Sequence, residues 1–127
     1  MTIAEYAVFA MVLVYLLPIG YAKAIGRRQF DNANPRDPKF YQSGLRARAH
    51  GAHVNGIEAF PLFAAAVIVA EFRGAPQGLI DKLAIAFIVL RLIYIATYLF
   101  NRASARSVFW AAAFAVNAAI FFAPLYS

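Results

Sequence analysis

The stretch Arg48–Ala70, RAHGAHVNGIEAFPLFAAAVIVA, decides how the chain can fold. Its apolar block, Ala59–Ala70, has 12 residues, whereas a helix needs about 20 residues to cross the roughly 30 Å hydrocarbon layer of a bilayer. A membrane-spanning helix must therefore begin earlier in the chain and include Asn55 and Glu58. The sequence predicts a span over about residues 52–71 that carries polar side chains into the membrane.

Three further apolar stretches lie on either side of this segment. We predict that they span the membrane over about residues 3–22, 80–100 and 107–125. The chain is 63% hydrophobic and only 14% charged, against about 25% charged residues in an ordinary globular domain. Four spans nearly use up its 127 residues, which excludes a separate soluble catalytic domain. The predicted fold is an all-α, integral membrane four-helix bundle that forms one domain over residues 1–127.

The basic residues predict the orientation in the membrane. The connection Lys23–Arg48 carries seven of the 12 Lys and Arg residues, whereas the N-terminus before the first span and the tail after Leu125 carry none. Because basic segments stay in the cytoplasm, we predict a multi-pass protein of the inner or cell membrane with both termini on the non-cytoplasmic side. The net charge of +6 belongs to membrane-flanking segments, so we expect lipids and no nucleic acid as partners.

The chain contains no cysteine. Disulfides, thiolate metal sites and a thiol nucleophile supplied by the protein are therefore excluded. Any thiol chemistry needs a thiol from a second molecule.

Polar side chains recur on one face of each of three predicted helices. At about 100° per residue, the residues that share a face are Arg48, Gly51, Asn55 and Glu58, then Arg91, Tyr94, Tyr98 and Arg102, and finally Arg106, Trp110 and Asn117. Such faces must meet one another or water, because polar groups facing lipid are costly. The pattern predicts a polar pocket near the cytoplasmic end of the bundle.

The composition of this pocket suits an anionic ligand that also carries an amine. Arginine forks match carboxylates, and Glu58 can pair with an ammonium group. An alternative also stands: Glu58 and Arg91 form one buried ion pair that holds the bundle together, with Tyr94 and Tyr98 as interface anchors.

His50 and His53, with Glu58, could in principle form a metal site. The two histidines, however, lie on the opposite side of the helix from Glu58, and no third ligand is apparent. We predict no metal site and expect both histidines to lie at a contact between subunits.

The segment Arg48–Phe63, RAHGAHVNGIEAFPLF, is similar to the RxxRAxxNxxExFPLF signature of the membrane-associated proteins in eicosanoid and glutathione metabolism, the MAPEG family. The segments Arg91–Tyr98 and Arg102–Trp110 resemble its third-helix and fourth-helix motifs. The chain is identified as a bacterial-type member that resembles the leukotriene C4 synthase and microsomal glutathione transferase group.

This resemblance implies a homotrimer with glutathione bound between neighbouring subunits. The residues that match ligand-binding positions are Asn55, Glu58, Tyr94 and Tyr98, with Arg48, Ser107 and Arg28 as weaker matches. Arg106 matches the catalytic position, where an arginine beside the glutathione sulfur favours the thiolate. The implied activity is a transferase or peroxidase acting on an apolar electrophile or a lipid hydroperoxide. The alternative is a structural or lipid-interacting family member that has lost thiol binding.

Gly51 departs from the signature, which has an arginine at this position. The loss of a charged hydrogen bond of about 1.5 to 3 kcal/mol would weaken glutathione binding roughly ten- to a hundredfold. Arg46, Arg48 or a loop arginine could substitute for it, or the thiol ligand could have been lost or changed. If the departure is a simple loss, we expect Gly51→Arg to tighten binding. Trp110 stands where some relatives have tyrosine.

Overall fold

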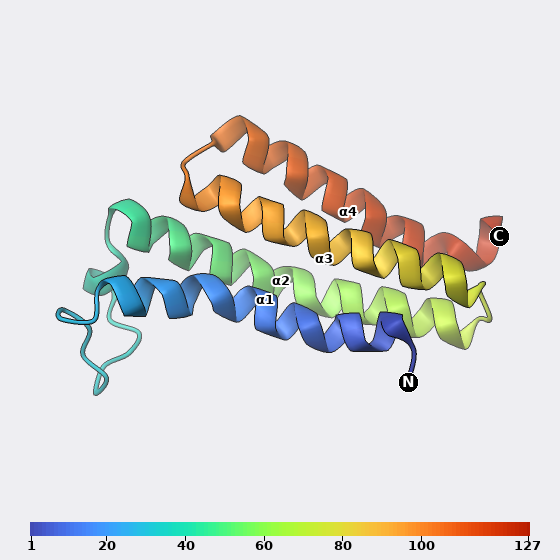
Figure 1. Cartoon of the computed structure of the whole chain (residues 1–127), viewed down its shortest axis with the longest axis horizontal. Helices are drawn as coiled ribbons and strands as arrows, with labels where there is room; N and C mark the ends of the chain where they lie inside the picture. Colours follow the sequence, from blue (N-terminus) through green and yellow to red (C-terminus); the bar gives the residue numbers. More distant parts are fainter.

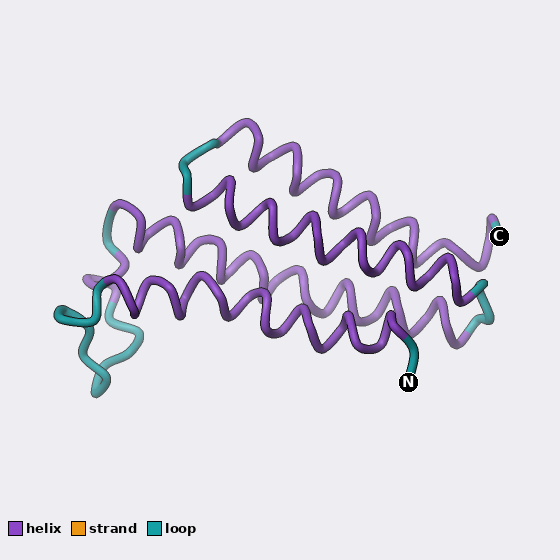
Figure 2. Tube along the Cα trace, in the orientation of Figure 1, coloured by secondary structure: helices purple, strands orange, loops and turns teal.

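The computed structural model describes all 127 residues, and helices account for most of them. The elements in chain order are α1 (Ile3–Ile25), the short 3₁₀ helix η1 (Pro38–Tyr41), α2 (Gly44–Phe72), α3 (Gln77–Leu99) and α4 (Ala103–Tyr126). The chain has no strand (Figure 2). The predicted all-α, four-helix class is confirmed.

The four long helices run up and down beside one another (Figure 1). Helix α1 packs against α2 and α3, α4 packs against the same two helices, and α1 does not contact α4. Both chain ends lie at one end of the bundle, and the long connection between α1 and α2 lies at the other (Figure 1). The helices α2 and α3 therefore form the middle of the bundle, where residues from three helices can meet.

The helices α1, α2 and α4 are each long and apolar enough to cross a membrane. Helix α3 is equally long, with 23 residues, but Asp81, Lys82 and Arg91 interrupt its apolar sequence. Asp81 accepts hydrogen bonds from the Ala4 amide of α1 and from the Gln77 side chain, and Arg91 lies over the ring of Tyr94. Three apolar helices and this packing support the membrane bundle that the sequence predicts.

Helix α2 begins at Gly44, eight residues before the predicted start of the span at residue 52. The added turns are held by a small cluster in which Ala49 packs with Ala22 of α1 and Phe40 of η1. Arg48 and Gly51, which the sequence pattern places on the same helical face as Asn55, lie in these added turns. The other helix limits fall within a few residues of the predicted spans.

Close helix packing in the middle of α1 and α2 depends on Gly56. A Cβ atom at this position would collide with the Cβ of Tyr15 and lie 3.3 Å from its Cα. Small residues allow such approaches in membrane bundles, where the driving force is van der Waals packing. The carbonyl oxygen of Tyr15 also contacts Nδ1 of His53, at 2.6 Å, so this histidine is satisfied within the chain.

A hydrogen-bonded network ties the start of α1 to the turn between α2 and α3. Thr2 Oγ1 donates to Glu71 Oε1 at 2.6 Å, and the Ala4 amide donates to Asp81 Oδ1 at 2.9 Å. The Gln77 amide nitrogen bridges both carboxylates, at 2.9 and 2.8 Å. The acidic groups lie at the N-terminus of α1, where the helix dipole favours negative charge. This network fixes the end of the bundle where the chain ends lie.

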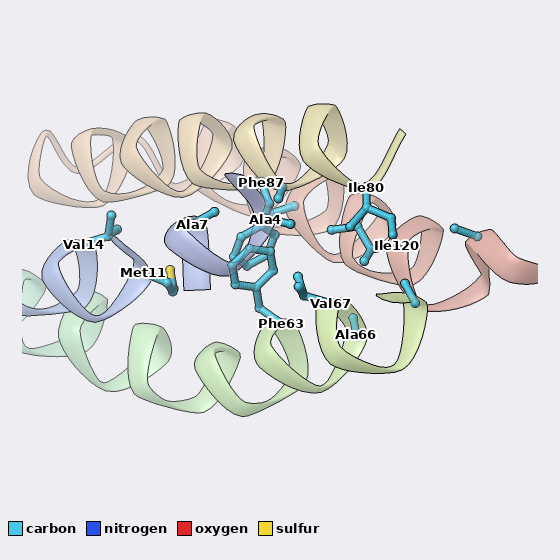
Figure 3. Packing of buried hydrophobic residues seen from close by; sticks show 14 of the residues in the cluster. Ala4, Ala7, Met11, Val14, Phe63, Ala66, Val67, Ile80, Phe87 and Ile120 are labelled. Atoms are coloured by element: carbon cyan, nitrogen blue, oxygen red, sulfur yellow. The ribbon is translucent and has the colours of Figure 1, made fainter. Parts of the chain in front are cut away.

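The main apolar core extends from this end of the bundle as far as Ala52, Tyr94 and Ile95, and Figure 3 shows its packing around Phe63 and Phe87. Phe63 of α2 and Phe87 of α3 stack with ring centroids 4.1 Å apart, beside Val67, Ile80 and Ile120, which are fully buried. Toward the opposite end, α3 and α4 diverge from α1 and α2 (Figure 1). Polar side chains from α2, α3 and α4 gather there beside the core, and they form the candidate site.

Candidate functional site

A pocket of about 390 Å³ lies among α2, α3 and α4, toward the end with the long connection. Its lining residues are Gly51, Asn55 and Glu58 from α2, Tyr94 and Tyr98 from α3, and Arg106, Ser107 and Trp110 from α4. The volume falls in the range of about 300 to 1,000 Å³ that is typical of small-molecule sites. The polar faces predicted on three separate helices therefore meet in one cavity.

Six of the eight predicted site residues line this pocket. They are Asn55, Glu58, Tyr94, Tyr98, Arg106 and Ser107. Helical spacing explains the grouping, because residues three or four apart project from one face. Their roles in binding or catalysis stay predictions. Gly51 and Trp110 complete the wall, and both were already visible in the sequence as members of the polar faces.

Arg106 lies over the ring of Tyr98, with Cζ 4.7 Å from the ring centroid. Tyr98 in turn packs edge-on against Tyr94, with centroids 5.8 Å apart. Such cation–π contacts hold a guanidinium in place without neutralising its charge. Arg106 also lies in the first turns of α4, where the helix dipole adds positive potential. The pocket therefore presents a fixed cation that favours an anionic group.

At Gly51 the side chain of Tyr98 from α3 lies against the backbone of α2. A Cβ atom at this position would collide with the Tyr98 hydroxyl and lie 2.8 Å from its Cζ. The space that the signature gives to an arginine stem is thus taken by a phenol. An arginine cannot be restored here without moving Tyr98, which the sequence pattern could not show.

Arg48 does not line the pocket. Its Nε donates to the carbonyl oxygen of Leu99 at 3.3 Å, at the end of α3, where the helix dipole favours a cation. Its side chain lies instead along a separate, mostly apolar groove of about 550 Å³ between α1, α2 and α3. In the single chain, Arg48 therefore does not replace the missing arginine.

Arg46 and Arg28 are also remote from the pocket. The Arg46 guanidinium lies 4.6 Å from the ring centroid of Phe40, near Gly26 at the end of α1. Arg28 is exposed in the turn that follows α1. Within one chain, Arg106 is the pocket's sole cation and Glu58 its sole carboxylate.

The alternative of a buried Glu58–Arg91 ion pair is not what the structure contains. The Cζ of Arg91 lies 4.2 Å from the ring centroid of Tyr94, and its Nε and Nη2 atoms are buried without a hydrogen-bond partner. Arg91 and Glu58 both line a second, smaller pocket beside the first.

The histidines lie on the other side of α2. The ring of His50 stacks on Tyr41, with centroids 4.8 Å apart, and His53 contacts Tyr15 as described above. Burial raises the pKa of the Tyr41 hydroxyl, which donates to the carbonyl oxygen of Pro35 at 3.3 Å. No group of three histidine, cysteine or acidic side chains is placed to hold a metal ion.

Comparison with known proteins identifies the family of the chain. Searches of curated proteins and of solved structures found no match. A sequence model of the MAPEG family matches residues 3–126, which is nearly the whole chain. The chain therefore belongs to the MAPEG family of integral membrane proteins, whose members are glutathione transferases, peroxidases and related proteins.

Proposed function

We propose that the protein is a membrane-bound, glutathione-dependent transferase or peroxidase that acts on apolar electrophiles or lipid hydroperoxides. The observation that carries the proposal is that six residues matching family ligand positions line one pocket of about 390 Å³. Glutathione supplies the thiol that the cysteine-free chain lacks. The chain's own residues bind it and control the protonation of its sulfur.

The donors and acceptors of the pocket fit this ligand. Glu58 provides the carboxylate that pairs with its ammonium group. Asn55 Oδ1 is buried without a partner and can accept a peptide N–H, which would relieve the cost of its burial. Arg106, fixed over Tyr98, lowers the pKa of a nearby thiol because an opposite charge within about 4 to 6 Å favours the charged form.

The reaction follows from this assignment. In transfer, the sulfur attacks the electrophilic carbon, a carbon–sulfur bond forms, and the displaced group leaves with its electron pair. In the peroxidase reaction, the sulfur attacks the terminal oxygen of the hydroperoxide and the O–O bond breaks. The alkoxide takes up a proton. A second glutathione thiolate then attacks the sulfur of the resulting sulfenic acid, a disulfide forms, and the displaced hydroxide takes up a proton to give water. In either reaction, Arg106 increases the fraction of ligand that is nucleophilic.

Charge balance points to a second source of cations. Glutathione in its thiolate form carries two carboxylates as well as the sulfur, whereas one chain supplies only Arg106. We therefore propose that a neighbouring copy in a homotrimer contributes Arg28 from the exposed turn after α1. With this assignment glutathione lies between subunits. Arg28 then provides the positive charge that Gly51 lacks and that Arg48, which does not line the pocket, does not provide.

The proposed orientation places the long basic connection and this pocket on the cytoplasmic side of the cell membrane. It is supported by the seven basic residues from Lys23 to Arg48 and by the location of both chain ends at the opposite end of the bundle (Figure 1). The site would thus face the compartment that contains the thiol.

A non-enzymatic role is the second candidate, and two observations favour it. Gly51 lacks the charged side chain that the family signature has at this position, and Arg48 donates its hydrogen bond to the carbonyl oxygen of Leu99 instead of lining the pocket. An activity assay separates the two functions: purified protein in nanodiscs is given glutathione with a chlorodinitrobenzene or with a fatty-acid hydroperoxide. Product formation at neutral pH that Arg106→Ala strongly reduces and Arg73→Ala leaves intact supports the enzyme, because Arg73 is exposed at the far end of the bundle. No product with either acceptor supports the non-enzymatic candidate.

A further inference from the structure

Two further cavities lie near the start of α2, and neither shares a residue with the candidate site. The first is the groove of about 550 Å³ described above, with Leu17 and Tyr21 of α1 on one wall and Leu92 and Leu99 of α3 on the other. The second cavity, of about 360 Å³, lies between the end of α1 and the first turn of α2. Leu45 lines both of them, so the two cavities adjoin.

The two cavities differ in polarity. Eight of the ten residues that line the groove are hydrophobic, and Arg48 is its only charged side chain. The second cavity has polar walls, which include Gln29, Ser43 and Arg46. No acidic side chain lines either cavity. The pair therefore matches a molecule that has an apolar chain and an anionic head.

Each cavity contains an arginine with donors that the chain itself does not use. The guanidinium of Arg46 is held 4.6 Å from the ring centroid of Phe40, and its Nη1 is buried without a hydrogen-bond partner. Arg48 bonds within the chain only through Nε, which donates to the carbonyl oxygen of Leu99. Its two Nη atoms remain for a ligand. A buried donor without a partner is costly, and the oxygens of an anion would relieve that cost.

Both arginines lie at the depth of the lipid headgroups. Arg48 and Arg46 precede residue 52, where the predicted span begins, by four and six residues on the same helix. At 1.5 Å per residue they lie about 6 to 9 Å outside the hydrocarbon layer, and the headgroup layer on each side is about 5 to 8 Å deep. Tyr21 lines the groove with Arg48, and tyrosine is typical of this interface. From there the groove continues along α1 and α3 into the hydrocarbon layer.

We propose that the two cavities bind an anionic phospholipid. Its phosphate lies on Arg48, one acyl chain lies in the groove between α1 and α3, and its polar head reaches Arg46 in the second cavity. Arginine forks match phosphate oxygens through parallel hydrogen bonds, and basic pockets between membrane helices suit lipid phosphates. Such a lipid would join α1, α2 and α3 at the end of the bundle. The proposal is independent of the proposed function.

The experiment measures which phospholipid lies against the groove. Phe100 lines the groove, and Phe100→Trp is combined with Trp110→Phe so that the chain has a single tryptophan. In nanodiscs of phosphatidylcholine, increasing fractions of the lipid are replaced by brominated phosphatidylglycerol or brominated phosphatidylcholine, and quenching of tryptophan fluorescence is recorded. We expect half-maximal quenching at a mole fraction at least fivefold lower for the anionic lipid. Equal quenching by the two lipids overturns the proposal.

Two controls separate a site from general attraction. Trp110 of the unsubstituted chain lies on α4 and lines neither cavity, so the two brominated lipids should quench it equally. A preference for the anionic lipid as large as that at Phe100→Trp would indicate attraction to the whole basic end and overturn the proposal. Millimolar inorganic phosphate should not reverse the quenching. Full reversal would assign the cavities to a soluble phosphate and overturn the phospholipid.

Variants test the two arginines in the single-tryptophan chain. Arg48→Met and Arg46→Met should each raise the half-maximal mole fraction of the anionic lipid at least threefold, because charged hydrogen bonds are lost. Arg36→Met is the matched control, since it removes the same charge from an exposed position in the long connection, and it should keep the preference. An equal loss in all three variants overturns the proposal. If Arg48→Met does not assemble, the comparison of the two lipids still decides it.

Discussion

The phenol of Tyr98 occupies the space next to Gly51 so fully that a single added carbon at position 51 would lie 2.8 Å from its Cζ. The same ring supports the guanidinium of Arg106, whose Cζ is 4.7 Å from the centroid. The glycine is therefore linked through one side chain to the proposed catalytic cation. The departure from the family signature is part of the packing that forms the site.

Gly51→Ala is expected to displace Tyr98 and, with it, Arg106. Glutathione affinity should fall roughly tenfold, which corresponds to about 1.4 kcal/mol, as measured by calorimetry. Gly20→Ala is the matched control, since a Cβ there meets nothing within 4 Å. Unchanged affinity in Gly51→Ala would show that Tyr98 does not position Arg106.

Gly51→Arg should weaken glutathione binding and not restore it. The sequence signature alone predicts tighter binding, but the structure gives the arginine stem no room beside Tyr98. The same calorimetric titration checks this prediction. Binding tighter than that of the unsubstituted chain would mean that Tyr98 moves aside at little cost and that position 51 is simply a lost contact.

Arg106→Ala should move the pH profile of glutathione conjugation to higher pH. Without the nearby cation the thiol pKa rises, so the thiolate fraction at neutral pH falls. An effect of about one to three pH units is expected for an opposite charge in contact. The pH profile of Arg106→Lys should lie between those of the unsubstituted chain and Arg106→Ala. Titration of the thiolate by its ultraviolet absorbance measures the shift directly, and an unmoved profile in Arg106→Ala would exclude the assigned role.

Phe63→Ala should destabilise the bundle by about 3 kcal/mol, as expected when a buried aromatic side chain is removed. The residue is fully buried and stacks on Phe87 at 4.1 Å. Reversible unfolding in mixed micelles measures the decrease in the free energy of unfolding. Phe72→Ala is the control, because Phe72 is 87% exposed. Equal stability of the two variants would contradict the core described above.

The orientation can be tested because the chain has no native cysteine. Asn32→Cys lies in the exposed basic connection, and Ser127→Cys lies at the other end of the bundle. A thiol reagent that cannot cross the membrane should label only Ser127→Cys in intact cells, and Asn32→Cys only after the membrane is opened. The reverse pattern would invert the proposed topology.

The sequence predicted most of the pocket because three helices each carry a regular polar face. Asn55 and Glu58, Tyr94 and Tyr98, and Arg106 lie at spacings that helical geometry alone brings to one side. Which faces would meet could then be inferred from the cost of exposing polar groups to lipid.

The features that the sequence could not predict depend on contacts between helices. Arg48 lies on the expected side of α2, but the carbonyl oxygen of Leu99 at the end of α3 engages it. The contact between Gly51 and the side chain of Tyr98 likewise joins two helices. Arg91 appeared as a possible partner of Glu58, whereas the structure leaves its Nε and Nη2 unpaired beside a separate cavity.

The central claim is that the pocket among α2, α3 and α4 binds glutathione. The most direct measurement is isothermal titration of the purified full chain in nanodiscs with glutathione, repeated with Arg106→Ala and Arg73→Ala. We predict saturable heat for the unsubstituted chain and for Arg73→Ala, and at least tenfold weaker binding for Arg106→Ala. No heat at millimolar glutathione, or equal binding by all three proteins, would contradict the claim.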